Sequence, residues 1–233
     1  MKKLFKAIRQ KNLEEVKVII EKNPEAVNSV AVPPPKKDNG QSPLQVALKT
    51  GALEIADYLI KNEADVNFME AEDDDPGVRC PVLHDAIRTV LMSLCYKKFN
   101  VSDSGLIIVE KLLKRGADPN QRASNGFDAL NAAISDAEFV LDNSAYSVSW
   151  EKAAQQLTKL FDLLIAYGAD FQGWADRGHF PEPCPMESNR ARYLDDFATG
   201  KDTVHILTKQ GEADLTANTR AVMRRYCKDR GLL

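Results

Sequence analysis

The stretch that decides the fold is GQSPLQVALKTGALEIADYLIKNEADVN, which runs from Gly40 to Asn67. Its apolar spacing predicts two short helices joined by a turn at Gly51, where glycine permits a tight reversal. Pro43 suits the first helical turn, because its missing N–H would be unpaired there, and Ser42 before it can cap the helix. A tight polar loop closes the unit. The same ending recurs at 116–120 (GADPN), 168–172 (GADFQ) and, more loosely, 211–214 (GEAD).

Each copy of this ending follows an apolar helical stretch, at 58–60, 112–113, 163–165 and 206–207. A recurring unit that cannot bury its apolar face alone must stack on its neighbours, so the pattern predicts a solenoid. Helix pairs are expected at 4–22, 40–67, 81–113, 126–167 and, in degenerate form, 178–211, before a final helix near 219–229.

Three elements of this pattern resemble ankyrin repeats: Gly-x-Ser/Thr-Pro-Leu starts, a mid-repeat Gly-x-Leu-Glu-Ile and Gly-Ala-Asp-x-Asn endings. The match is strongest over 38–67 and good over 80–87 with 106–120 and 126–134 with 157–172. The resemblance implies an all-α, ankyrin-type solenoid, a right-handed stack of antiparallel helix pairs with hairpin loops projecting to one side. It implies one domain, 1–233, with repeats at about 1–31, 38–70, 76–122, 123–173 and 174–217 and a C-terminal capping helix at 218–233.

The spacing departs from the family in the third and fourth repeats. An ankyrin unit repeats about every 33 residues, whereas the loop aspartates Asp65, Asp118 and Asp170 are 53 and 52 residues apart. The additional residues fall between the two helices of each pair, and their apolar pattern stays helical. We therefore expect both helices of these pairs to be lengthened into ridges near 89–105 and 135–157.

Two hairpin loops are also longer than the repeat requires, one before Gly40 and one before Arg79. The first holds a proline run, which we interpret as a stiff strut rather than a ligand for a polyproline-binding module. The second holds the acidic residues Glu70 and 72–75, interpreted as a solvated run rather than a docking patch. Both loop tips are expected to reach farther out than those of a standard repeat.

Composition bounds the class of protein. A hydrophobic content of 44%, a charged content of 28% and a net charge of −3 are ordinary for a folded domain and give no global field for nucleic acid. The final helix is basic, but it lacks interleaved aromatics for stacking on bases, so a nucleic-acid partner is disfavoured. No membrane span or signal peptide is evident, and a cytoplasmic location with reduced thiols is expected for the four cysteines Cys80, Cys95, Cys184 and Cys227.

The sequence favours a protein that is not an enzyme and carries no metal or cofactor. His84 falls on the repeat's own histidine position, where the resemblance implies a hydrogen bond to loop backbone that joins neighbouring repeats. Cys80 and His84 could form half of a zinc site, but no second pair completes it. No nucleotide-binding, hydrolase or metalloprotease motif occurs. An alternative places a reactive thiol, Cys184, or a histidine, His179, beside the degenerate fifth repeat.

The resemblance implies a protein partner bound by the concave helix face and the hairpin tips. Arg79, Arg88 and Phe127 are the expected anchors, because arginine and aromatic side chains concentrate binding energy in interfaces. Phe127 could alternatively pack on its own hairpin. Mapped onto the repeat, the candidate partner-binding residues are Arg9, Gln10, Asn39, Gln41, Lys49, Thr50, Arg79, Arg88, Thr89, Asn125, Phe127, Ser135 and Asp136.

The function favoured by the sequence is a non-catalytic protein–protein interaction module, an adaptor or inhibitor, present as a monomer or weak homodimer. A second hypothesis is a structural one, in which the lengthened ridges form the seam of a homo-oligomer.

Overall fold

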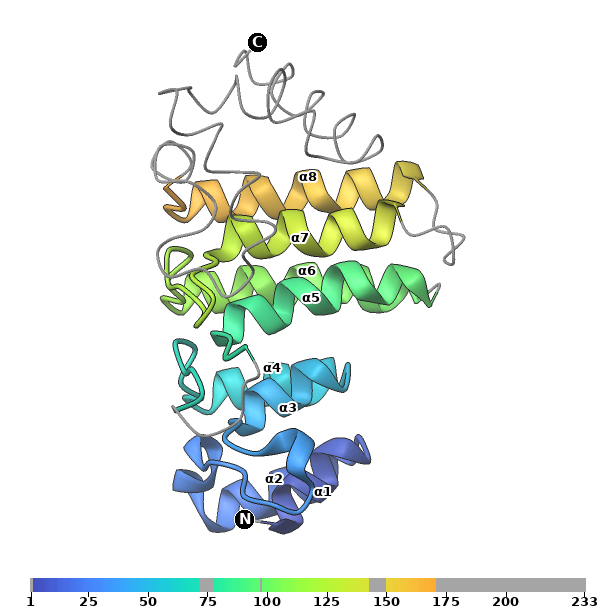
Figure 1. Ribbon diagram of the computed structural model, residues 1–233. Helices are drawn as coiled ribbons and strands as arrows, with labels where there is room; N and C mark the ends of the chain where they lie inside the picture. Colours follow the sequence, from blue (N-terminus) through green and yellow to red (C-terminus); the bar gives the residue numbers. More distant parts are fainter. Residues whose placement is uncertain (1, 72–77, 97, 143–149, 171–233) are drawn as a thin grey trace.

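The computed structural model describes residues 2–71, 78–96, 98–142 and 150–170, and the remainder of the chain lies outside the described residues. Four antiparallel helix pairs stack on one another in the described part (Figure 1). The bounds are α1 Lys2–Arg9, α2 Leu13–Lys22, α3 Pro43–Lys49, α4 Leu53–Lys61, α5 Val82–Cys95, α6 Phe99–Lys114, α7 Ala129–Asp142 and α8 Trp150–Ala166, with short 3-10 turns η1 Pro24–Asn28 and η2 Lys36–Asp38.

The helices form two layers. The odd-numbered helices α1, α3, α5 and α7 pack in sequence on one side, and the even-numbered helices α2, α4, α6 and α8 pack in sequence on the other. We call these the inner and outer helices. A continuous apolar core runs between the layers, so each pair is covered by its neighbours. The all-α solenoid predicted from the sequence is confirmed, while the expected fifth repeat and capping helix lie outside the described residues.

The local chemistry of the second pair is as predicted. The Ser42 hydroxyl accepts a hydrogen bond from the backbone N–H of Gln45 at 3.2 Å, and the Gln45 side-chain oxygen accepts one from the Ser42 N–H at 3.2 Å. This reciprocal capping box, with Pro43 in the first turn, fixes where α3 begins. Gly51 has a φ of +65°, which glycine adopts at little cost, and the chain reverses there into α4.

The hairpin loops are joined by a ladder of asparagine side chains. The Asn67 amide donates to the Gly116 carbonyl at 2.9 Å, and its oxygen accepts from the Asp118 N–H at 2.8 Å. Asn120 repeats both contacts with Gly168 and Asp170, at 2.8 and 2.9 Å. Each loop therefore satisfies backbone groups of the next one, which explains why the recurring ending carries an amide side chain.

The predicted lengthening of the third and fourth pairs is confirmed. Helices α3 and α4 have 7 and 9 residues, whereas α5, α6, α7 and α8 have 14, 16, 14 and 17. In Figure 1 the ends of α5 and α6 extend past those of α3 and α4 on the side away from the hairpins. A side-chain carbon at Gly105 would lie 2.9 Å from Val90 Cγ2, so glycine allows α6 to approach α5 closely.

The first long hairpin loop differs from the prediction. Its tip was expected to reach outward, but Pro34 and Pro35 lie against α1, where they share a small pocket with Phe5 and Arg9. Asp38 is buried and forms an ion pair with Arg9. The opposite charge on α1 and the apolar side of Phe5 hold the loop against the inner helix, a long-range attraction that loop length alone does not reveal.

The second long loop also differs from the prediction. The sequence pattern groups Glu70 with a solvated acidic run, yet Glu70 is buried. Its carboxylate accepts a hydrogen bond from the Cys80 N–H at 3.0 Å and pairs with Lys49 at 3.2 Å. A buried carboxylate is tolerated because it has both a cation and a backbone donor. The rest of the acidic run, 72–75, lies outside the described residues.

Candidate functional site

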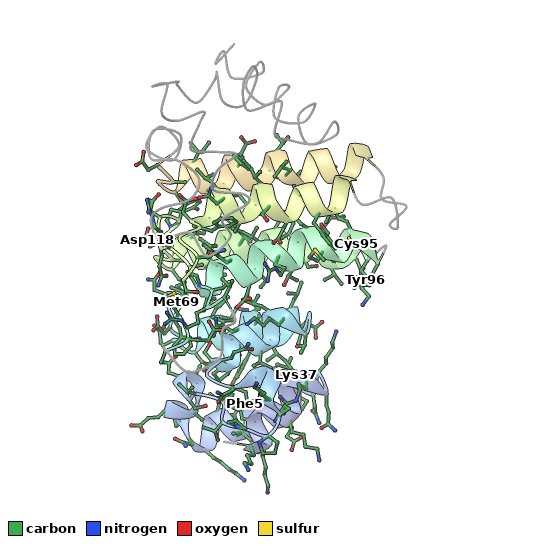
Figure 2. The ribbon with its side chains drawn as sticks, viewed as in Figure 1. Phe5, Lys37, Met69, Cys95, Tyr96 and Asp118 are labelled. Carbon is green, nitrogen blue, oxygen red and sulfur yellow. The ribbon has the colours of Figure 1, made fainter. Side chains whose placement is uncertain are left out.

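The structure places the candidate partner-binding residues in two groups. The first group lies on the inner helices or at their ends and consists of Arg9, Gln10, Lys49, Thr50, Arg88, Thr89, Ser135 and Asp136. The second group lies in the hairpin segments and consists of Asn39, Gln41, Arg79, Asn125 and Phe127. Asp118 and Met69 mark the hairpin side of the stack in Figure 2, and Cys95 and Tyr96 mark the opposite side, where the helices turn.

Four of these residues form a row of ion pairs that links successive inner helices. Arg9 pairs with Asp38 next to α1. Lys49 of α3 reaches both Glu70, at 3.2 Å, and Asp85 of α5, at 3.6 Å. Arg88 of α5 pairs with Asp136 of α7 at 3.4 Å. Each of these charges has an internal role that sequence reasoning missed, because the pairs join elements far apart in the chain.

Burial divides the candidates further. Asp136 and Gln41 are buried, so both offer little surface to a partner and act mainly as internal partners. Four candidates are exposed on the inner side: Gln10, Lys49, Arg88 and Ser135. Four others are half-buried: Arg9, Asn39, Thr50 and Thr89. The exposed and half-buried residues remain the candidate contact surface.

The hairpin candidates are held by backbone contacts. The Arg79 N–H donates to the Ser124 hydroxyl at 3.0 Å, and the Ser124 N–H donates to the Arg79 carbonyl at 3.0 Å. Asn125 accepts from the Phe127 N–H at 3.2 Å. Phe127 is half-buried, so its side chain is neither fully enclosed nor fully exposed. Arg79 is also half-buried.

His84 has the structural role that the resemblance implied. It is buried and hydrogen-bonds the backbone of Gln121 in the following hairpin segment. Burial, with a smaller contribution from the Arg88 charge, lowers the pKa of His84 to about 4. The imidazole is therefore neutral near pH 7 and acts as a link between repeats.

The buried thiol of Cys80 is poorly suited to catalysis. Burial is the main cause that raises the pKa of Cys80 to about 11, which leaves the thiol protonated and unreactive near pH 7. No group of three or more His, Cys, Asp or Glu side chains able to hold a metal occurs among the described residues. The alternative reactive groups, Cys184 and His179, lie outside them.

A groove of about 340 Å³ lies where the short second pair meets the long third pair. Its lining comes from the end of α3, the α5 extension and the turns between helices, and it includes the candidate residues Lys49, Thr50, Arg88 and Thr89. We call it the step groove. The spacing of the repeats in the sequence could have predicted this groove. Where a helix of 7 residues, α3, packs beside one of 14, α5, the additional length of α5 has no neighbour on that side. Sequence reasoning missed the other lining residues, which are Lys11, Leu48, Gly51, Asp85, Met92, Ser93, Tyr96, Lys98 and Val101.

The fold is the all-α solenoid that stacked ankyrin repeats form. The family model described as ankyrin repeats (3 copies) matches residues 2–70. Ankyrin repeat and SAM domain-containing protein 6 from Rattus norvegicus and from Mus musculus are each 30% identical to this chain over 131 residues. The matched stretch is 56% of this chain but 12% of each relative. Residues 2–70 are thus similar to ankyrin repeats, and repeats of this kind generally mediate protein–protein interaction.

No helix within the described ranges combines the length and the apolar character needed to cross a membrane.

Proposed function

We propose that this chain is a non-catalytic adaptor or inhibitor that binds a protein partner through its inner helices and hairpin loops. The observation that carries the proposal is the ion-paired inner surface. Arg9, Lys49 and Arg88 are held by carboxylates from neighbouring elements, so the side chains that face a partner are ordered before binding. A preformed surface loses little conformational entropy on docking.

The pKa values of His84 and Cys80 support a binding role over chemistry at these two residues. His84 and Cys80 are buried and titrate far from neutral pH, so neither can serve as a general base or nucleophile in the described part. A cytoplasmic site of action is part of the proposal. Cys80 and Cys95 form no disulfide in the described part of the chain, as is usual for thiols in a reducing compartment.

Partner capture from a native extract tests the inner-surface assignment. The test variant combines Gln10→Arg, Phe127→Ala and Ser135→Arg. These changes add two large, positively charged side chains to the candidate surface and remove one aromatic ring from it. We expect capture to fall at least about tenfold, because a central aromatic anchor is lost and charged side chains obstruct docking.

The matched control combines Val18→Arg, Glu54→Ala and Ile107→Arg on the outer helices. Val18 and Ile107 are 48% and 54% exposed, so this triple also adds two arginines without touching the inner surface. Because it removes Glu54 as well, its net charge changes by +3 against +2 for the test variant, which makes it the stricter control. The control should capture as the unmodified chain does, with both variants checked by circular dichroism. Equal capture by the inner and outer variants would overturn the assignment.

A specific observation favours a homo-oligomeric scaffold as the second candidate. Tyr96 and Phe139 on the lengthened ridges are 63% and 44% exposed. Exposed aromatic side chains are typical of interfaces. Light scattering over a wide concentration range distinguishes the two functions, because a scaffold of this kind would give a mass that rises with concentration.

A further inference from the structure

The step groove lies on the side of the stack away from the hairpins, at three consecutive turns. Lys11 comes from the turn between α1 and α2, Thr50 and Gly51 from the turn after α3, and Lys98 from the turn between α5 and α6. Lys11 Nζ donates to the Gly51 carbonyl at 3.3 Å, which links the first two turns. The third turn extends past them because α5 and α6 are longer (Figure 1).

The walls of the groove are largely apolar. Leu48 and Met92 line it from α3 and α5, and Val101 lines it from α6. Tyr96, at the end of α5, is 63% exposed at the rim and is directed away from the stack (Figure 2). These side chains form a concave surface that fits an aliphatic or aromatic side chain of a ligand.

The charges around the groove are unequally neutralised. Lys49 is paired with Glu70 and with Asp85, which is buried beside the groove, and Arg88 is paired with Asp136. Lys11 and Lys98 differ, because neither pairs with a carboxylate among the described residues. Lys98 Nζ lies over the Tyr96 ring, 5.6 Å from its centre, and Lys11 Nζ donates to the backbone carbonyl of Gly51. The excess positive charge is therefore at the turn end of the groove.

We propose that the step groove binds a short acidic segment of the partner protein. An apolar side chain of that segment occupies the space between Leu48, Met92 and Val101, and an adjacent Asp or Glu carboxylate lies between Lys11 and Lys98. This inference rests on the proposed protein-binding function and extends the contact surface to the turn end of the inner helices α3 and α5, away from the hairpins.

A carboxylate fits the groove better than a phosphate group. Phosphate recognition favours the bidentate geometry of arginine, and the guanidinium in this groove, Arg88, is already paired with Asp136. A dianion would also be repelled more strongly than a carboxylate by Glu70, which pairs with the groove residue Lys49.

Fluorescence anisotropy with three labelled peptides tests the proposal. The probes are Gly-Glu-Glu-Leu-Trp-Glu-Glu-Gly, its glutamine counterpart Gly-Gln-Gln-Leu-Trp-Gln-Gln-Gly, and a version of the latter with a phosphoserine beside the leucine. We expect the acidic peptide to bind the full chain at least about tenfold more tightly than the glutamine peptide, with an affinity that weakens as salt is added.

The paired variants are Lys11→Glu with Lys98→Glu and, as the control, Lys22→Glu with Lys159→Glu. All four lysines are exposed, and both variants change the net charge equally. The first variant should weaken acidic-peptide binding at least about tenfold and the second less than about twofold. Lys11→Met with Lys98→Met should weaken acidic-peptide binding by an intermediate factor. This neutral variant replaces Lys11→Glu with Lys98→Glu if the charge-reversed protein is unstable at the assay temperature.

Three outcomes would overturn the proposal: equal binding of the acidic and glutamine peptides, equal loss in the two charge variants, or tighter binding of the phosphopeptide. Failure of the groove is distinguishable from failure of the proposed function. If peptide binding is absent but partner capture still depends on Gln10, Phe127 and Ser135, only the groove assignment is wrong.

Discussion

Replacing Leu91 with alanine lowers the free energy of unfolding by about 2 to 5 kcal/mol. Leu91 is 0% exposed and lies in the part of α5 that extends beyond a standard repeat. Helix α5 contacts α6, α7 and α8, so the cavity left by the truncation is enclosed and cannot collapse fully. Urea denaturation followed by circular dichroism measures the change.

Ile107→Ala is the matched control for this prediction. Ile107 lies in α6 and is 54% exposed, so its truncation should cost less than about 1 kcal/mol. If Leu91→Ala lowers the free energy of unfolding no more than Ile107→Ala does, the lengthened part of the third pair is not packed into the core. The α5 extension could then not act as a rigid wall of the step groove.

The second large effect concerns pH and Asp85. Burial raises the pKa of Asp85 to about 7 from an ordinary 3.8, and the Lys49 charge, 3.6 Å away, only partly opposes it. Glu70 raises it further, while Arg88 and the Gln45 side chain lower it. Neither Asp85 oxygen accepts a hydrogen bond of regular geometry within the described part.

The direction of the pH effect follows from proton binding. Between about pH 4 and pH 7 the folded chain retains the Asp85 proton that the unfolded chain has released, so stability falls as pH rises through this window. The rise of pKa from 3.8 to about 7 corresponds to a loss on the order of 4 kcal/mol.

Asp85→Asn should remove this loss. The stability of the variant relative to the unmodified chain should increase from pH 4 to pH 7 and then level off, as measured by urea denaturation at each pH. His84, whose lowered pKa makes stability fall as pH falls from 6.5 to about 4, is present in both proteins and cancels in the difference. Asp65→Asn, at an exposed loop position, is the control. A pH-independent difference for Asp85→Asn would contradict the account.

The sequence predicted the helix pairs and their unequal lengths because those features depend on local pattern. Ser42, Pro43 and Gly51 act within their own repeat, and the spacing of Asp65, Asp118 and Asp170 measures how much helix has been added. The local rules of helix capping, turn geometry and apolar periodicity were therefore sufficient to predict the helix pairs and their relative lengths.

The contacts between repeats were harder to predict. The amides of Asn67 and Asn120 bridge loops about 50 residues apart, and the direction of the first long loop depends on the pairing of Arg9 with Asp38. The repeat pattern identified which positions face the inner side, but it did not show which charges there neutralise one another. Asp136 is buried for that reason, although the pattern marked it as a contact residue.

Site-specific photo-crosslinking tests most directly whether the inner surface carries partner binding. A photoreactive phenylalanine analogue is placed in the full chain at Gln10 or Ser135 on the inner side, or at Val18 or Ile107 on the outer side, all of which are exposed. The account predicts that the inner positions crosslink to one common partner polypeptide in native extract and that the outer positions do not. Crosslinking of that polypeptide from Val18 and Ile107, with none from Gln10 and Ser135, would contradict it.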